Sequence, residues 1–398
     1  MSAAALMMGF PPAPDSQVTL ANWRVAPFHR WAFQHVREIV PSADIPNAPD
    51  NVWSLPSAAV DLSSFSFGHD GQRQGFEAFL EATDTDGIVV VHRGAVVAEA
   101  YAHGMTRHTP HILMSVSKSL LGIVAGILVE KGVLGLDEPI TRFVPEVAST
   151  VYAGAAVRNL LDMRVGVHFD EDYLATSGLI VDYRKAQNWN PLDLGERPTD
   201  LRSFYQRFTQ SDGPHGGRFH YVSPNTDLMG WVIERAAGKR YADLLSDLLW
   251  QPMGAERSAY ITVDRLGAPR CAGGVCATVM DLARVGQLIV QNGRRGGTQI
   301  IPERWIDDLT ADGDPDAWER GDFTGYFSGL PMHYRYKWYV LRRPEPVMFA
   351  FGVNGQYLFV DRKKQIVIAK VSSQTLPIDE QQIMLGVKGA EAILQYLG

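Results

Sequence analysis

Strand-like patterns occur near both ends of the chain. The segment "GIVVVHRGAVVAEAYA" (residues 87–102) contains two apolar, β-branched runs around the turn His92-Arg93-Gly94. This arrangement predicts a hairpin. The segment "GQYLFVDRKKQIVIAKVSS" (355–373) has strand-like runs on both sides of a charged turn, which predicts two further strands.

Helical patterns lie between these strands and at the end of the chain. The helix at 223–238 has a Ser/Pro/Asn start and a glycine stop, and the last pattern is amphipathic. The helical segments are "LMSVSKSLLGIVAGILVEKG" (113–132), "VRNLLDM" (157–163), "SPNTDLMGWVIERAAG" (223–238), "YADLLSDLLWQPMG" (241–254) and "DEQQIMLGVKGAEAILQYL" (379–397). Strands at both ends with helices between them predict a mixed α/β (α+β) fold.

Three regions follow from these patterns. Residues 1–80 are rich in proline and tryptophan and predict an N-terminal arm packed on the domain. Residues 81–140 and 265–398 predict an α/β lobe. Residues 141–264 predict a mostly helical inserted lobe, within which 166–222 carry long connections rich in Asp, Gly, Pro and aromatic residues.

Composition narrows the classes of partner. The chain has 398 residues, 46% of them hydrophobic, and a formal net charge of -7, so it can bury a large core and has no general attraction for nucleic acid or anionic membranes. No apolar stretch is long enough to span a bilayer, and the N-terminus lacks the basic start of a secretory signal. We therefore expect a cytoplasmic protein that acts on a small molecule.

Cysteine and histidine do not form the patterns of a metal site. Cys271 and Cys276 are too few for a disulfide framework or a zinc site and predict two buried thiols. His103, His108 and His111 surround Pro110 and predict ordinary surface or capping histidines. We expect neither a metal nor a cofactor.

Several hydrolase and nucleotide-binding motifs are absent from the sequence. It has no Gly-rich dinucleotide fingerprint, no phosphate-binding Gly-Lys-Ser/Thr loop and no His-Glu-x-x-His pair. No serine has a glycine two positions before it, which excludes the Gly-x-Ser-x-Gly nucleophile elbow. A serine hydrolase built on this chain must present its nucleophile in another way.

Ser115 and Lys118 begin the helical segment 113–132. Residues i and i+3 share one face of a helix, so the lysine amine can reach the serine hydroxyl. Apolar neighbours lower the pKa of the lysine, and unpaired amides at the helix start can stabilise an oxyanion. The alternative interpretation is a helix-capping serine followed by a surface lysine.

Tyr221 stands just before the helix at 223–238, after a glycine-rich turn. A nearby lysine ammonium lowers the pKa of a tyrosine, so we expect Lys118 and Tyr221 to share a proton and relay it to a leaving group. The alternative is a half-buried aromatic residue with a hydrogen-bonded tip.

Together these stretches resemble serine hydrolases of the class C β-lactamase and penicillin-binding-protein superfamily, most of all its carboxylesterase and 6-aminohexanoate-dimer hydrolase branch. The resemblance covers most of the chain and includes "FDEDY", "FHYVSPNTDLMGW" and "GVNGQYLFVD". It implies a β-lactamase/transpeptidase-like fold, in which helices and an inserted helical lobe flank an antiparallel sheet.

The resemblance also assigns catalytic roles to residues of this chain. It implies Ser115 as the acylated nucleophile, Lys118 as its base and Tyr221 as the proton relay. It implies an oxyanion hole made by the backbone amides of Ser115 and Val353. Tyr173 matches a second tyrosine, which bonds the leaving nitrogen in the amide-cleaving branch.

Departures from the family pattern bear on the substrate. Ser223 replaces the asparagine of the Tyr-x-Asn element, and Val353-Asn354-Gly355-Gln356 replaces the Lys-Thr-Gly element that binds the β-lactam carboxylate. Arg184 stands where an acidic residue would pair with the ammonium of the aminohexanoate dimer. We therefore expect weak β-lactamase activity and no preference for a cationic substrate end.

The predicted substrate-binding residues are Tyr173, Arg184, Trp189, Ser223, Tyr339 and Asn354. The favoured function is a carboxylesterase that forms an acyl-enzyme on Ser115. The alternatives are an amidase of the aminohexanoate-oligomer type, an acyltransferase, and a binding module that no longer turns over. The oligomeric state stays open between a monomer and a homodimer.

Overall fold

An antiparallel sheet forms one half of the molecule. The computed structural model describes residues 6–69 and 71–398. In the described residues this sheet has seven strands, and every neighbouring pair runs antiparallel. Its strands, in spatial order, are β11 (Met332–Arg335), β12 (Trp338–Leu341), β13 (Val347–Gly352), β14 (Gln356–Asp361), β15 (Ile366–Ser372), β4 (Thr85–His92) and β5 (Ala95–Tyr101).

Strands from the N-terminal and C-terminal parts of the chain pair within this sheet. Strand β15 pairs with β4, with Ile368 opposite Val90. The predicted hairpin is confirmed: β4 and β5 are joined at Arg93 and Gly94, which have φ values of 50° and 80°, as a tight hairpin turn requires. The predicted strands at 356–361 and 366–372 are also confirmed.

Helices cover both faces of the sheet. Val89 and Val91 face one hydrophobic cluster, which includes residues of α3 (Val116–Glu130) and α9 (Val279–Val290). Ile88 and Val90 face a second cluster, which includes residues of α2 (Phe76–Ala82) and α12 (Glu380–Leu397). Successive side chains of a strand point to opposite faces, so β4 anchors both layers. The structure is a mixed α/β (α+β) fold in which helices flank an antiparallel sheet, as the sequence predicted.

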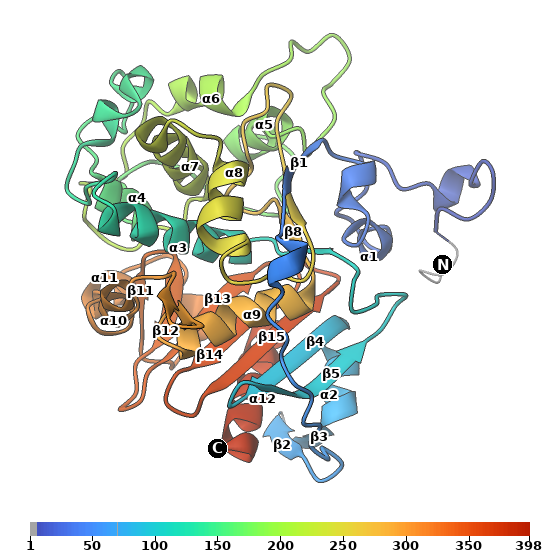
Figure 1. Ribbon diagram of the computed structural model, residues 1–398. Helices are drawn as coiled ribbons and strands as arrows, with labels where there is room; N and C mark the ends of the chain where they lie inside the picture. Colours follow the sequence, from blue (N-terminus) through green and yellow to red (C-terminus); the bar gives the residue numbers. More distant parts are fainter. Residues whose placement is uncertain (1–5, 70) are drawn as a thin grey trace.

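Short helices gather on the far side of α3 from the sheet (Figure 1). They are α4 (Val157–Leu161), α5 (Leu179–Ala186), α6 (Leu201–Phe204), α7 (Ser223–Ala237) and α8 (Tyr241–Leu245). The segment predicted as one helix over 241–254 instead continues from α8 as a π-helical turn, Ser246–Trp250. Helix α3 contacts α7 and α8 on one side and strands β12, β13 and β14 on the other. It is therefore the wall between the helices and the sheet.

A second, four-stranded sheet joins the N-terminal arm to the rest of the chain. Its spatial order is β1 (Ser42–Ile45), β7 (Ala259–Thr262), β8 (Val275–Ala277) and β6 (His111–Ile112). The arm also carries the short helix α1 (His29–Ala32). Because β6 ends at Ile112, three residues before Ser115, this sheet fixes the start of α3.

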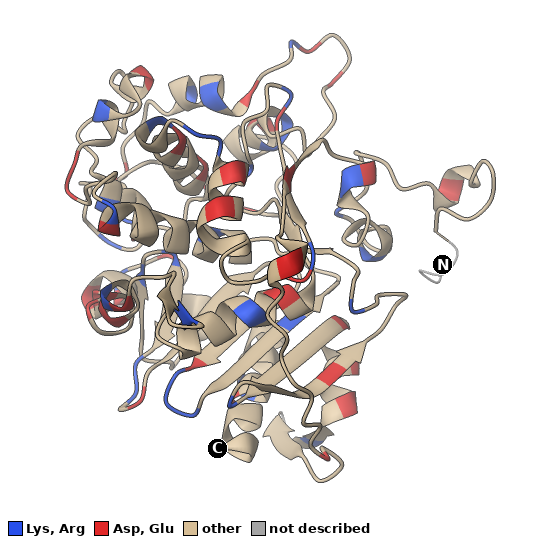
Figure 2. Ribbon diagram, viewed as in Figure 1, with Lys and Arg blue, Asp and Glu red and all other residues tan. Residues whose placement is uncertain are grey.

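The remaining elements lie at the periphery. They are the hairpins β2 (Ser66–His69) with β3 (Gln72–Gly75) and β9 (Arg294–Arg295) with β10 (Thr298–Gln299), and the helices α10 (Glu303–Ala311) and α11 (Pro315–Glu319). Charged residues of both signs are mixed over the helices and loops, and the central strands carry few of them (Figure 2). Among the described residues, no helix has the length and apolar character needed to cross a bilayer.

Candidate active site

Ser115 stands at the start of α3 and faces a cavity. The preceding residue, Met114, has a φ of 45°, a left-handed conformation that costs a residue with a side chain energy and is found mostly where function requires it. The Ser115 side chain makes no capping hydrogen bond with the helix. The alternative of a purely capping serine is therefore wrong.

Lys118 is buried beside Ser115 and is not a surface lysine. Its side chain is 1% exposed. Its Nζ lies 2.7 Å from Ser115 Oγ, 3.0 Å from Ser223 Oγ and 2.7 Å from the carbonyl oxygen of Ala272. These three acceptors fix the position of the amine. Its distance from Ser115 Oγ is that of a strong hydrogen bond.

Burial lowers the pKa of Lys118 to about 7, because a charged ammonium loses its hydration in an apolar site. The carboxylates of Glu171 and Asp227 oppose this change, and the positive charge of Arg270 adds to it. A large fraction of Lys118 is therefore neutral at neutral pH, and a neutral amine can accept the proton of the serine.

Tyr221 lies beside the Lys118 amine. Its ring centroid is 4.9 Å from Lys118 Nζ, and the ring stacks on Phe323 at 4.5 Å. Burial raises the pKa of Tyr221 above its ordinary value, and the carboxylate of Glu171 adds to the increase. The expectation of a lowered tyrosine pKa is wrong, because desolvation and Glu171 outweigh the groups that lower it, which are Ser115, Arg270 and Tyr339. Tyr221 is a neutral phenol that can donate its proton.

Glu171 is the acidic residue of this cluster, and sequence reasoning missed it although it lies in the motif "FDEDY". Its carboxylate accepts hydrogen bonds from the Ser223 backbone N–H at 2.8 Å and from the Tyr173 hydroxyl at 3.2 Å. Ser223 therefore links this carboxylate to the amine of Lys118. The signal in the sequence was a glutamate two positions before the predicted tyrosine.

The loop after β13 passes directly beside Ser115. A Cβ atom on Gly352 would lie 2.9 Å from the Ser115 nitrogen and from the Leu113 oxygen, so only glycine permits this approach. Within the described chain, neither the Ser115 nor the Val353 backbone N–H donates a hydrogen bond to another protein group. Two unused amides at the nucleophile are what an oxyanion requires.

Hydrogen bonds fix the shape of this loop. The Asn354 side chain donates to the Gln374 carbonyl at 2.8 Å, and Asn354 has a φ of 60°. The buried side chain of Gln356 donates to the carbonyl oxygens of Asn354 and Ser372. The Lys-Thr-Gly position of the superfamily is thus filled by an amide that supports the loop.

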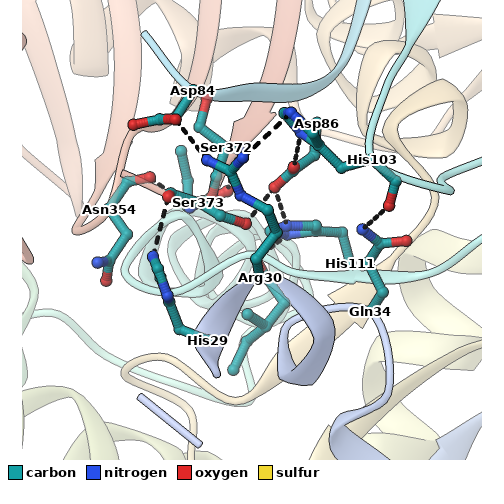
Figure 3. A network of polar contacts seen from close by, with 12 residues as sticks. His29, Arg30, Gln34, Asp84, Asp86, His103, His111, Asn354, Ser372 and Ser373 are labelled. Carbon is teal, nitrogen blue, oxygen red and sulfur yellow. Dashed lines mark hydrogen bonds and ion pairs between the residues drawn. The ribbon is translucent and has the colours of Figure 1, made fainter. Parts of the chain in front are cut away.

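The N-terminal arm supports the same loop from outside (Figure 3). His29 Nε2 lies 2.9 Å from the Ser373 carbonyl oxygen, and buried Asp86 bonds Ser373 together with His103 and His111. The prediction of surface or capping histidines is wrong for His111, which is completely buried in this network. The Asp86 carboxylate uses both of its oxygens here, and its pKa is lowered by these partners against the effect of burial.

A cavity of about 480 Å³ opens onto Ser115, a size that suits a small-molecule substrate. Most of the predicted substrate-binding and oxyanion residues line it: Tyr173, Arg184, Trp189, Ser223, Val353 and Asn354. Tyr339 does not line it. That ring is packed in one hydrophobic cluster with Tyr221 and stacks on Phe349 at 5.2 Å.

Further residues of the cavity wall were not predicted. Residues 20–26 of the N-terminal arm contribute Arg24 to it, and Gln187 and Arg270 complete the same region. Nothing local in the sequence marks these side chains, because their segments are brought to the cavity only by the fold. Tyr183 also lines the cavity, and its hydroxyl bonds Asp227, the ion-pair partner of Arg270.

The residues of this site lie within a segment that matches a known protein family. Residues 65–388 match the family described as Beta-lactamase, which includes the serine, the lysine, both tyrosines and the Val353 loop. The chain belongs to the beta-lactamase family. It is therefore a hydrolase of this family, whose members typically use a serine acyl-enzyme.

Relatives within the beta-lactamase family include amidases and esterases. The chain is 33% identical to a 6-aminohexanoate-dimer hydrolase of Paenarthrobacter ureafaciens over 365 residues, which cover 92% of this chain and 90% of the relative. It is 26% identical to Esterase EstB of Burkholderia gladioli over 53% of this chain and 56% of that protein.

A solved Bacillus anthracis structure, provisionally described as a 6-aminohexanoate-dimer hydrolase, has the same fold. It superimposes with a TM-score of 0.87 at 26% identity and covers 98% of this chain and 99% of that one. The chain is therefore a beta-lactamase-family hydrolase related to both amidases and esterases.

Proposed function

We propose that this protein is a serine carboxylesterase that forms an acyl-enzyme on Ser115, with Lys118 as the base and Tyr221 as the proton relay. The observation that carries the proposal is the buried Lys118 amine, 2.7 Å from Ser115 Oγ, with a pKa lowered to about 7. A base is most effective when its pKa is close to the working pH. A lysine with its ordinary pKa would be protonated and unable to accept a proton.

The first half of the reaction follows from these contacts. Neutral Lys118 takes the proton of Ser115 as Oγ attacks the carbonyl carbon of the ester. The N–H groups of Ser115 and Val353 stabilise the oxyanion. When the C–O bond breaks, Tyr221 gives its proton to the leaving oxygen and regains one from the Lys118 ammonium, which returns to the neutral amine.

The second half uses the same groups with water as the nucleophile. Lys118 takes a proton from the water as its oxygen attacks the acyl carbon. The Ser115 oxygen leaves with a proton returned through the same pair, and the carboxylic acid is released. Neither half requires an external redox partner.

The contacts of Tyr173 favour ester over amide cleavage. In the amide-cleaving branch the matching tyrosine bonds the leaving nitrogen, but here its hydroxyl donates to Glu171 at 3.2 Å. Its proton is therefore engaged elsewhere. An alkoxide or phenoxide leaves far more readily than an amine anion, so an ester does not need a second hydrogen-bonding group at its leaving atom, and Tyr221 supplies the one proton required.

A linear amidase is the second candidate, because the 6-aminohexanoate-dimer hydrolase is 33% identical over nearly the whole chain. In that case Tyr173 would leave Glu171 when substrate binds. The Tyr173→Phe variant separates the two functions: an amidase loses amide turnover in this variant, and an esterase keeps its ester turnover.

The test is hydrolysis of 4-nitrophenyl acetate, 4-nitrophenyl butyrate and the linear aminohexanoate dimer by the wild type and by Ser115→Ala. Ser119→Ala is the matched control, because Ser119 lies on the same helix and its hydroxyl donates to the Lys337 carbonyl, away from Ser115 and Lys118 in the hydrogen bonds of the described residues. Ester turnover that vanishes in Ser115→Ala and persists in Ser119→Ala supports the proposal. A wild type that turns over none of the three and resists a fluorophosphonate label is the binding module instead.

A further inference from the structure

Three arginines gather in one wall of the cavity, each from a different segment. Arg24 comes from the N-terminal arm, Arg184 from α5 and Arg270 from the loop between β7 and β8. The guanidinium carbons of Arg24 and Arg270 lie 5.8 Å and 5.1 Å from the centroid of the Trp189 ring. Two of the cations therefore flank one aromatic side chain.

This cationic wall is close to the nucleophile. A Cβ atom on Gly273 would contact the tip of the Trp189 ring at 3.3 Å and the Met114 Cα at 3.9 Å. Met114 directly precedes Ser115. A group bound between the arginines would thus belong to the same substrate molecule whose carbonyl is at Ser115.

The positive charge of this wall is only partly balanced. Arg270 forms an ion pair with buried Asp227 at 2.6 Å. Within residues 6–69 and 71–398, Arg24 and Arg184 form no ion pair: Arg24 bonds the Asn190 side chain, and Arg184 bonds the backbone carbonyls of Ala175 and Asp172. Burial lowers the pKa of Arg24 to about 9, and the charges of Arg184 and Arg270 contribute.

Hydrogen-bonding capacity is also unused at this place. Arg24 Nε, Arg270 Nε and both polar atoms of the Gln187 amide are buried without a partner among the described residues. Arg270 is 6% exposed and Gln187 is 1% exposed. Buried polar groups are almost always paired in native proteins, so the unpaired N–H donors of Arg24, Arg270 and Gln187 are expected to find their acceptor in the cavity.

Glu171 does not supply the missing partner of the arginines and Gln187. It is the only carboxylate that lines the described cavity, and it is engaged by the Ser223 N–H and the Tyr173 hydroxyl. An incoming ammonium would therefore meet three arginines and an occupied carboxylate, whereas a planar carboxylate matches the donor geometry of guanidinium groups.

We propose that Arg24, Arg184 and Arg270, with the Gln187 amide, form a carboxylate subsite, so that the physiological substrate is an ester with a second, free carboxylate. This inference rests on the proposed esterase function. The proposed subsite has the opposite charge to one that binds a substrate ammonium, because Arg184 stands where such a site has an acidic residue. Substrates of this class are monoesters of dicarboxylic acids, or esters whose leaving group carries the acid.

The experiment compares matched anionic and neutral esters. For the acyl side, mono-4-nitrophenyl succinate and adipate are compared with their methyl-capped 4-nitrophenyl diesters. For the leaving-group side, 4-acetoxybenzoate is compared with its methyl ester. In at least one pair we expect kcat/KM for the anion to exceed that for the capped ester by about tenfold, which corresponds to about 1.4 kcal/mol. Added salt should reduce this preference, because it screens the charges.

Substitutions of Arg24 test whether the arginines cause the preference for anionic esters. Arg24→Met should reduce the anion-to-neutral ratio of kcat/KM by about tenfold, and Arg24→Lys should retain most of it because the charge is kept. Arg37→Met is the matched control. Arg37 also lies in the arm and stacks on an aromatic ring, but that ring is Tyr260, which does not line the cavity. This variant should leave the ratio unchanged.

The outcomes separate this inference from the proposed function. If Ser115-dependent turnover of the neutral esters is present and no pair shows an anionic preference, the carboxylate subsite is wrong and the esterase stands. A preference that survives Arg24→Met and high salt also overturns the subsite. If neither ester of any pair is turned over by Ser115, the function itself fails. Binding of adipate to Ser115→Ala, measured by calorimetry and weakened by Arg24→Met, would then still support the anion site.

Discussion

Replacement of Glu171 by glutamine tests the electrostatic control of Lys118. Lys118 Nζ lies 3.0 Å from Ser223 Oγ, and the Glu171 carboxylate accepts from the Ser223 N–H at 2.8 Å. Ser223 therefore separates the two charges. At roughly 7 Å and an effective dielectric constant of about 20, unit charges interact by about 2.4 kcal/mol. Water in the cavity screens part of this interaction.

The sign of the effect follows from the charge that is removed. The carboxylate favours the ammonium form of Lys118 and raises its pKa from the value that burial alone would give. Without it the amine loses its proton at lower pH. In the wild type, kcat/KM rises with pH as the neutral form of Lys118 appears, and the midpoint of this rise lies near the Lys118 pKa of about 7. In Glu171→Gln it should move down by about one pH unit.

The assay is the initial rate of 4-nitrophenyl butyrate hydrolysis from pH 5 to 9 at constant ionic strength and low substrate concentration, where kcat/KM reports ionisation of the free enzyme. Asp172→Asn is the matched control, because Asp172 is the adjacent, exposed carboxylate and does not act on Lys118. A midpoint that stays in place or rises in Glu171→Gln, while both variants remain folded, would refute Lys118 as the titrating base.

Three further substitutions test the remaining parts of the site. Lys118→Met should lower kcat/KM for esters by about 10³-fold at every pH, because the variant lacks the amine that takes the Ser115 proton; a small loss would contradict the mechanism. Tyr221→Phe should lower kcat by about 10²-fold, with a weaker effect for esters of acidic phenols, which need less proton donation. Gly352→Ala should lower kcat by about 10²-fold, because the new Cβ would lie 2.9 Å from the Ser115 nitrogen and displace one oxyanion donor; an unchanged kcat in a folded variant would argue against this oxyanion hole.

Local sequence features predicted the hairpin, the terminal helix and the serine–lysine pair. Each of these depends on nearby residues: the turn at Arg93 and Gly94, the amphipathic repeat of 380–397, and the three-residue spacing of Ser115 and Lys118. The alternatives of a capping serine and a surface lysine could not be rejected at that level, because burial of Lys118 depends on Ser223 and Ala272, which lie far away in the chain.

Predictions of a pKa shift, a side-chain direction and the burial of a residue failed where these depend on residues from other segments of the chain. The predicted direction of the Tyr221 pKa shift was wrong because desolvation is the largest influence on it, and desolvation is a property of the packed site. Tyr339 was misplaced because the face on which a strand residue points depends on the register of β12 in the sheet. His111 was expected at the surface, but Asp86 from another strand holds it in the interior.

The sequence by itself determined the chemistry that this protein carries: a serine, a lysine and a tyrosine in the pattern of one family, with an arginine where a substrate ammonium would need an acid. Only the tertiary structure decided the electrostatic setting of that chemistry. Folding brings Glu171 toward Lys118 and collects Arg24, Arg184 and Arg270 around one cavity. Charge interactions depend on distance and burial, and no spacing along the chain specifies either for segments that are far apart in the sequence.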